Sequence, residues 1–180
     1  MNIIFEIDKI QFINFHKKYI MGSNIIKSNL RRISIFLIIA FTSSMLVSFS
    51  VYLTFILLIL LIFTILIIKK IFPLTLRRKL STLFKTDLYK NTFAQTELNV
   101  METGIKTNTH YGSKSFTWKS LYDLSLTEEY FIIRTVSDEI LYIPCKSINI
   151  DEFTKIIQNY SNIPINKRYP TDIKYKRYFA

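Results

Sequence analysis

The longest pattern in the chain is an apolar run over residues 33–68, which contains no Asp, Glu, Lys, Arg, His, Gln, Asn, Pro or Gly. A run of about 18 uncharged apolar residues is enough for a membrane span. As one helix this run would be about 54 Å long, against roughly 30 Å of hydrocarbon. Two helices, about 33–48 and 51–68, fit better, with an extracytoplasmic turn near the Ser-Phe-Ser of residues 48–50. One long helix bent in the membrane is the alternative.

Basic residues lie on both sides of this run. They include Arg31 and Arg32 before it and Lys69, Lys70, Arg77, Arg78 and Lys79 after it. Lys and Arg concentrate in cytoplasmic flanks, so the pattern predicts a hairpin that returns both flanks to the cytoplasm. We therefore expect a multi-pass protein of the bacterial inner (cell) membrane with both termini cytoplasmic. These cations are expected to contact anionic lipid headgroups, and a role in topology alone explains them equally well.

The segment before the run, residues 1–32, predicts a strand followed by a helix. Residues 2–7 alternate, with Ile3, Phe5 and Ile7 on one face and Ile4 and Glu6 on the other. We expect this strand to pair with a sheet edge of the C-terminal domain.

The helix of this arm is expected from about Lys9 to Met21. Asp8 and Gln11 resemble a capping box, and Phe12, Phe15, Tyr19 and Ile26 recur at helical spacing. An amphipathic helix beside a membrane entry lies in the lipid interface or packs against the soluble domain, and both placements are open at this stage.

After a basic juxtamembrane connector, residues 69–92, the chain changes to short β-prone runs separated by turn signals. We predict antiparallel strands over 95–101, 105–110, 114–118, 130–136 and 139–144. A helix follows, with Asn149 as its cap, Glu152 three residues on and an apolar stripe from Phe153 to Tyr160. The sequence thus predicts a membrane α-helical hairpin plus a small α+β domain over residues 93–160.

Four short motifs in this domain resemble those of a known protein family. They are Leu98–Gly104 (LNVMETG), Trp118–Tyr122 (WKSLY), Tyr130–Ile133 (YFII) and Ile143–Lys146 (IPCK). In this order after a hairpin they resemble the YcxB-like family, with Gly104, Trp118, Pro144 and Lys146 as the expected domain signature. The resemblance implies a pleckstrin-homology-like bent antiparallel sheet closed by a C-terminal helix, and it implies no activity.

A domain of roughly 70 residues builds only a marginal core by itself. We expect it to gain further apolar contacts, either from the N-terminal strand or from a second copy in a homodimer. An unknown protein partner is a further expectation.

Charge narrows the choice of partners. The chain has 24 Lys+Arg and 13 Asp+Glu, for a net charge of +11. By region the net charge is +4 for 1–32, +6 for 69–90, −3 for 91–160 and +4 for 161–180. The folded domain is therefore acidic, which disfavours nucleic acid. The basic, tyrosine-rich tail, residues 161–180, is expected to be solvated, to contact lipid, or to meet a protein or RNA partner.

Residues suited to chemistry are few and scattered. His16 and His110 have no metal-ligand spacing, and Glu128 and Glu129 are adjacent loop carboxylates with no third group to orient them. Cys145 is the single cysteine, which fits a reducing compartment, and it is expected to be a packing residue. We therefore predict no catalytic, metal-binding or cofactor-binding residues and no cofactor.

These patterns favour a non-enzymatic membrane protein whose cytoplasmic domain mediates protein or lipid interaction, with the lipid bilayer itself as a partner. The alternative is a membrane immunity or transporter-accessory protein that acts through the hairpin. A hydrolase or transferase ranks third.

Overall fold

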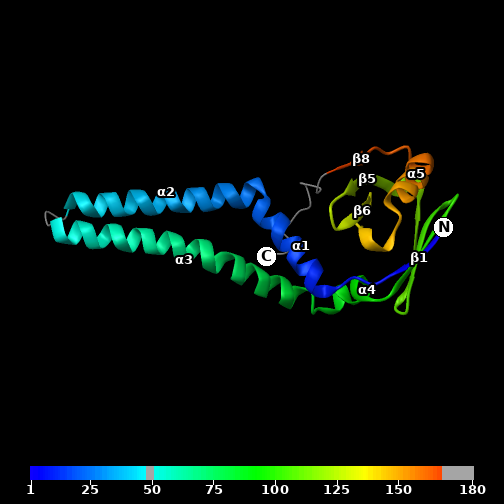
Figure 1. The fold of residues 1–180 in the computed structure, drawn as a ribbon, viewed down its shortest axis with the longest axis horizontal. Coiled ribbons are helices and arrows are strands. Elements are labelled where there is room, and N and C mark those ends of the chain that lie inside the picture. Colours follow the sequence, from blue (N-terminus) through cyan, green and yellow to red (C-terminus); the bar gives the residue numbers. More distant parts are fainter. Residues whose placement is uncertain (48–50, 168–180) are drawn as a thin grey trace. The chain divides into compact units, whose positions relative to one another are not determined.

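The structure is a computed structural model that describes residues 1–47 and 51–167 (Figure 1). The chain divides into two compact units, one made of Met1–Phe15 together with the chain from Leu83 onward, and one made of His16–Thr82. The predicted turn at residues 48–50 and most of the predicted basic tail lie outside the described residues. The protein is a mixed α+β structure with antiparallel sheets.

Two sheets form the first unit. The first sheet is a meander in chain order of β1 (Asn2–Phe5), β2 (Thr96–Met101), β3 (Gly104–Thr109) and β4 (Gly112–Thr117). The second has the order β7-β6-β5-β8, made of β5 (Leu121–Leu126), β6 (Tyr130–Thr135), β7 (Ile140–Pro144) and β8 (Ile165–Asn166). All pairings are antiparallel except that of β8, which lies parallel to β5.

The predicted pairing of the N-terminal strand is confirmed. β1 joins the edge of the first sheet in antiparallel register with β2, with Ile3 opposite Leu98 and Ile4 opposite Glu97. Ile3, Phe5 and Ile7 are buried, whereas Ile4 is 61% exposed. The alternation in the sequence therefore identified the inward face correctly.

The helix after β1 begins as its capping signal predicted. α1 (Lys9–Gly22) starts where the Asp8 carboxylate accepts a hydrogen bond from the backbone N–H of Gln11 at 2.7 Å. Phe12 and Phe15 are almost completely buried. In this part of α1 the aromatic residues pack within the domain, which is the second of the two placements that the sequence left open.

The second sheet has its centre at β6, in which every residue is buried. α5 (Ile150–Ser161) packs on it, with the rings of Phe131 and Phe153 5.1 Å apart. The amide oxygen of Asn149 accepts a hydrogen bond from the Glu152 backbone, which confirms the predicted cap. Asn162 ends the helix in a left-handed conformation.

Two predictions for the domain were wrong. No strand was predicted over Leu121–Leu126, which forms β5. That run has no β-branched residue and contains Asp123, so its β signal is weak, and burial between β6 and β8 stabilises it as a strand. Trp118, predicted to end a strand, begins the 3₁₀ turn η2 (Trp118–Ser120) instead.

Long helices make up the second unit. α2 (Asn24–Val47) ends just before the predicted turn and α3 (Val51–Leu83) begins just after it. Among the described residues, one helical segment, Leu58–Leu83, is long and apolar enough to cross a membrane, with mean hydropathy 2.3 and no part of its apolar window buried.

The second predicted membrane helix is longer than expected. α3 does not end at Ile68, where the apolar run stops, but continues through Pro73 to Leu83. Lys and Arg are good helix formers, so charge alone does not end a helix. The predicted connector, residues 69–92, therefore contains the end of α3, then η1 (Asp87–Tyr89) and the start of α4 (Lys90–Phe93).

Candidate functional site

A cluster of aromatic side chains joins the N-terminal arm to the domain. The ring centroid of Phe12 lies 5.2 Å from that of Phe84 and 4.9 Å from that of Tyr142. Phe93 and Tyr130 also contact Phe12, and Phe15 contacts Tyr130 at 4.7 Å. Most of these contacts are edge-to-face, the arrangement that aromatic quadrupoles favour. The cluster therefore brings side chains from both sides of the apolar segment into one core.

The cations expected to contact lipid lie outside this core, in the second unit. Arg31 and Arg32 are on α2, and Lys69, Lys70, Arg77, Arg78 and Lys79 are on α3, and all are exposed. On the last turns of α3, Leu76 and Leu80 are buried. The charged heads are therefore solvated, as lipid headgroup contact requires.

Two of the signature residues lie together at the turn between β2 and β3. Gly104 has φ +152°, and a Cβ there would come within 2.0 Å of the backbone oxygen of Phe116, so only glycine fits. The indole N–H of Trp118 donates to the carbonyls of Met101 and Glu102, at 3.2 and 2.9 Å. The Trp118 ring stacks on Tyr160 of α5 at 5.3 Å. Both residues therefore have structural roles at this turn.

The other two signature residues lie at the end of β7. Pro144 is buried and Lys146 is exposed. Together with Glu128, Glu129 and Cys145 they line a shallow hollow of about 450 Å³. The structure thus brings the predicted carboxylate pair and the cysteine close to this half of the signature.

The thiol in this hollow is not set up for nucleophilic chemistry. Burial raises the pKa of Cys145, and its thiol lies 3.6 Å from the carbonyl oxygen of Thr127. A nucleophilic cysteine needs the opposite shift, toward the thiolate. In the part of the chain that the structure describes, no three His, Cys, Asp or Glu residues are placed to hold a metal ion.

The two histidines lie in different environments, one buried and one exposed. His16 is buried, and desolvation lowers its pKa to about 3, so it is neutral at physiological pH. His110 is exposed at the end of β3 and its ring packs on Tyr111.

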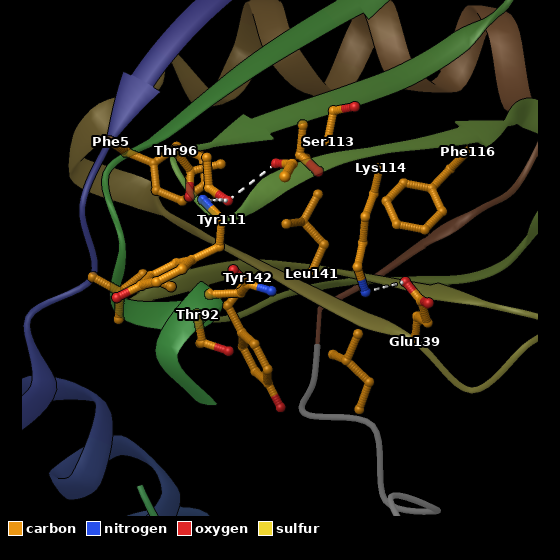
Figure 2. A pocket seen from close by; sticks show the side chains of 16 residues that line it. Phe5, Thr92, Thr96, Tyr111, Ser113, Lys114, Phe116, Glu139, Leu141 and Tyr142 are labelled. Atoms are coloured by element: carbon orange, nitrogen blue, oxygen red, sulfur yellow. Dashed lines mark hydrogen bonds and ion pairs between the residues drawn. The ribbon is translucent and has the colours of Figure 1, made fainter. Parts of the chain in front are cut away.

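A cleft between the first sheet and β7 is the most enclosed of the hollows described here (Figure 2). It has a volume of about 230 Å³. Its lining comes from one end of the first sheet, from α4 and from β7, and includes Phe5, Thr96, Thr107, Tyr111, Lys114, Glu139 and Tyr142. At its rim, Lys114 Nζ lies 3.0 Å from Glu139 Oε2, which links β4 to the residue before β7.

A buried ionic group in the second sheet was not predicted. Arg134 is 6% exposed, and its Nη1 lies 3.8 Å from Asp123 Oδ2. The same carboxylate accepts hydrogen bonds from Ser125 and from the side-chain amide of Asn166. Arg134 also lies 4.8 Å above the ring of Tyr122. The group holds β8 against β5, and only the pairing of separate strands reveals it.

No family model, no curated protein and no solved structure matches this chain.

Proposed function

We propose that the chain is an integral inner-membrane protein that crosses the bilayer twice and carries one cytoplasmic interaction domain without catalytic activity. The observation that carries this proposal is the Phe12–Phe84 contact. The chain leaves the first unit after Phe15 and returns to it at Leu83. A segment that starts and ends in one folded unit crosses a membrane an even number of times.

The pairing of β1 with β2 supports the same conclusion independently, because an arm on the far side of the membrane cannot join this sheet. α3 contains the segment that satisfies the length and hydropathy requirement, and α2 brings an apolar stretch from Ile33 to Val47. Exposed cations at both ends of the apolar run favour a cytoplasmic location for the domain.

The order of strands supports a pleckstrin-homology-like domain. A four-stranded meander is followed by β5, β6 and β7 in a second sheet and then by α5. This agrees with the fold that the YcxB-like resemblance implies. An interaction role fits the absence of a catalytic arrangement among the described residues, where His16 is buried and neutral and the Cys145 thiol is held protonated.

Topology is tested by thiol labelling of intact cells. In a Cys145→Ala background, single cysteines replace Glu6 in the arm, Ser115 in the domain or Phe49 at the predicted turn. An impermeant maleimide is expected to label only the cysteine at position 49, and to label positions 6 and 115 after permeabilisation. Labelling of positions 6 and 115 from opposite sides contradicts the proposal.

The interaction role is tested in the full-length chain by a photo-crosslinking amino acid. It is placed at Ser115 on the exposed edge of the domain, or at Phe55 on the exposed surface of α3. We expect protein or lipid adducts from position 115 in native membranes. Protein adducts from position 55 alone favour the alternative, an immunity or accessory protein that acts through its membrane helices.

A further inference from the structure

We infer that the cleft between the first sheet and β7 binds a small zwitterion, a molecule with one oxyanion and one ammonium group. The inference goes beyond the proposed function and does not depend on the number of membrane crossings, because every residue that lines the cleft belongs to the first unit.

The size of the cleft limits the ligand. Its volume of about 230 Å³ is below the roughly 300–1,000 Å³ of pockets that hold drug-sized molecules. Nucleotides and folded partners are therefore too large to enter. An amino acid, a dipeptide or the phosphoethanolamine group of a lipid has a suitable size.

The charges of the lining select the class of ligand. Among the residues that line the cleft, Lys114 and Glu139 carry the charged groups, one of each sign. A ligand with a single charge would pair with one of them and break the existing ion pair of the other. A zwitterion gives each a new partner, the oxyanion to Lys114 and the ammonium to Glu139.

The ion pair at the rim opens easily. The side chains of Lys114 and Glu139 are 55% and 42% exposed, and exposed pairs of this kind contribute little to stability. Figure 2 shows the two charged groups meeting across the cleft, with Phe116 and Leu141 beside them. The pair connects β4 to the residue before β7, and these two strands belong to different sheets, so it can separate without breaking a sheet.

The side chain of Thr107 places a hydroxyl in the wall of the cleft. Thr107 faces inward beside Lys114, its partner in the β3–β4 register, and is 6% exposed. The neighbouring Thr96 and Thr109 hydroxyls donate to the carbonyls of Ala94 and Gly112. Among the residues that the structure describes, the Thr107 hydroxyl has no hydrogen-bond partner. The oxygen of this hydroxyl is not fully enclosed by the protein, so it is open to a polar atom of a ligand in the cleft.

Binding is tested by saturation-transfer NMR on the purified full chain in a maltoside detergent. The probes are glycylglycine and O-phosphoethanolamine, with acetate and ethylamine as singly charged controls. We expect both zwitterions to bind in the millimolar range or tighter, and the controls at least tenfold more weakly. No zwitterion binding, or equal binding of the singly charged controls, overturns the inference.

Substitutions locate the site. Lys114→Gln and Glu139→Gln are each expected to weaken zwitterion binding at least tenfold. Lys106→Gln, on the outward face of β3 opposite Ser115, is the matched control and is expected to bind as the native chain does. The single charge reversals Lys114→Glu and Glu139→Lys are each expected to abolish zwitterion binding. The variant that carries both is expected to bind again, because one charge of each sign is present. Unchanged binding in both Gln variants overturns the inference, and Trp118 fluorescence checks that each variant is folded.

The same measurement distinguishes a free solute from a lipid headgroup. Glycylglycine binding is compared in nanodiscs of phosphatidylethanolamine and of phosphatidylglycerol. Weaker binding in phosphatidylethanolamine supports the inference with the lipid headgroup as occupant, since the headgroup competes. Equal binding supports it with a soluble zwitterion.

Discussion

The rings of Phe12 and Phe84 lie 5.2 Å apart, although the whole apolar segment of the chain separates them in sequence. Both side chains are buried in the first unit. Their contact joins the two ends of the segment that is expected to enter the membrane. This pair therefore links the packing of the domain to the topology of the chain.

Truncation of this pair tests the link. Phe12→Ala and Phe84→Ala are each expected to lower the free energy of unfolding by about 3–5 kcal/mol, because each leaves a cavity in a packed core. The double variant should lose about 0.5–1.5 kcal/mol less unfolding free energy than the sum of the two single losses, because the two rings interact with each other. Denaturation of the full chain in detergent, followed by Trp118 fluorescence, measures these values.

The control for this experiment is Phe36→Ala, at a side chain that is 72% exposed on α2. It should leave the stability of the domain unchanged. Strictly additive losses for Phe12 and Phe84 would show that the two rings do not interact.

A disulfide tests the pairing of β1 with β2. Ile4 and Glu97 are opposite each other in the register. Opposed residues of antiparallel strands have Cα atoms about 4.5–5.5 Å apart, which is within the range that a disulfide spans. In a Cys145→Ala background, Ile4→Cys with Glu97→Cys should form a bond on mild oxidation in membranes, seen as faster migration on a non-reducing gel.

The matched control pairs Ile4→Cys with Lys106→Cys on β3. β2 lies between them, so two strand spacings of about 4.8 Å separate the positions, too far for a disulfide. A bond in the control, or none in the test pair, would contradict the observed strand order.

Much of the domain follows from local signals in the sequence. The alternation of residues 2–7 identified the buried face of β1, and Asp8 and Asn149 marked the starts of α1 and α5. These features depend on side-chain period and on caps, which act over a few residues. They are therefore readable without knowledge of the fold.

Other features depend on contacts between distant parts of the chain. β5 contains Asp123, whose carboxylate is acceptable in a sheet only because Arg134 and Asn166 approach it. The cleft combines one end of four strands with β7, and no single stretch of sequence marks it. Phe84 and Phe93 resemble ordinary residues of a basic connector until Phe12 packs against them.

Gly104 provides a test of the signature turn. Gly104→Ala is expected to destabilise the domain by about 1–3 kcal/mol or more, because the new Cβ meets the backbone of Phe116 and φ is positive. Thermal unfolding of the full chain, followed by Trp118 fluorescence, measures the loss. Gly22→Ala is the control, since nothing lies within 4 Å of its added Cβ, and its midpoint should be unchanged or slightly higher. Equal midpoints for the two variants would show that the turn tolerates a side chain.

The burial of His16 is expected to make the free energy of unfolding depend on pH. Burial lowers its pKa from 6.5 to about 3, so between these values the unfolded chain binds a proton that the folded chain does not. Stability is therefore expected to fall as pH decreases from about 6.5 toward 3, with a His16 contribution of up to about 1.4 kcal/mol per pH unit. His16→Leu should flatten the dependence of the unfolding free energy between pH 6 and 4. His110→Gln, at an exposed side chain, should keep the native slope. Hydrogen bonds from Asn2 and Asn108 lower the pKa of Glu97, and its contribution to the slope is the same in the native chain and in both variants. If the His16→Leu slope matches the native one, His16 is protonated in the folded chain and its burial does not control its charge.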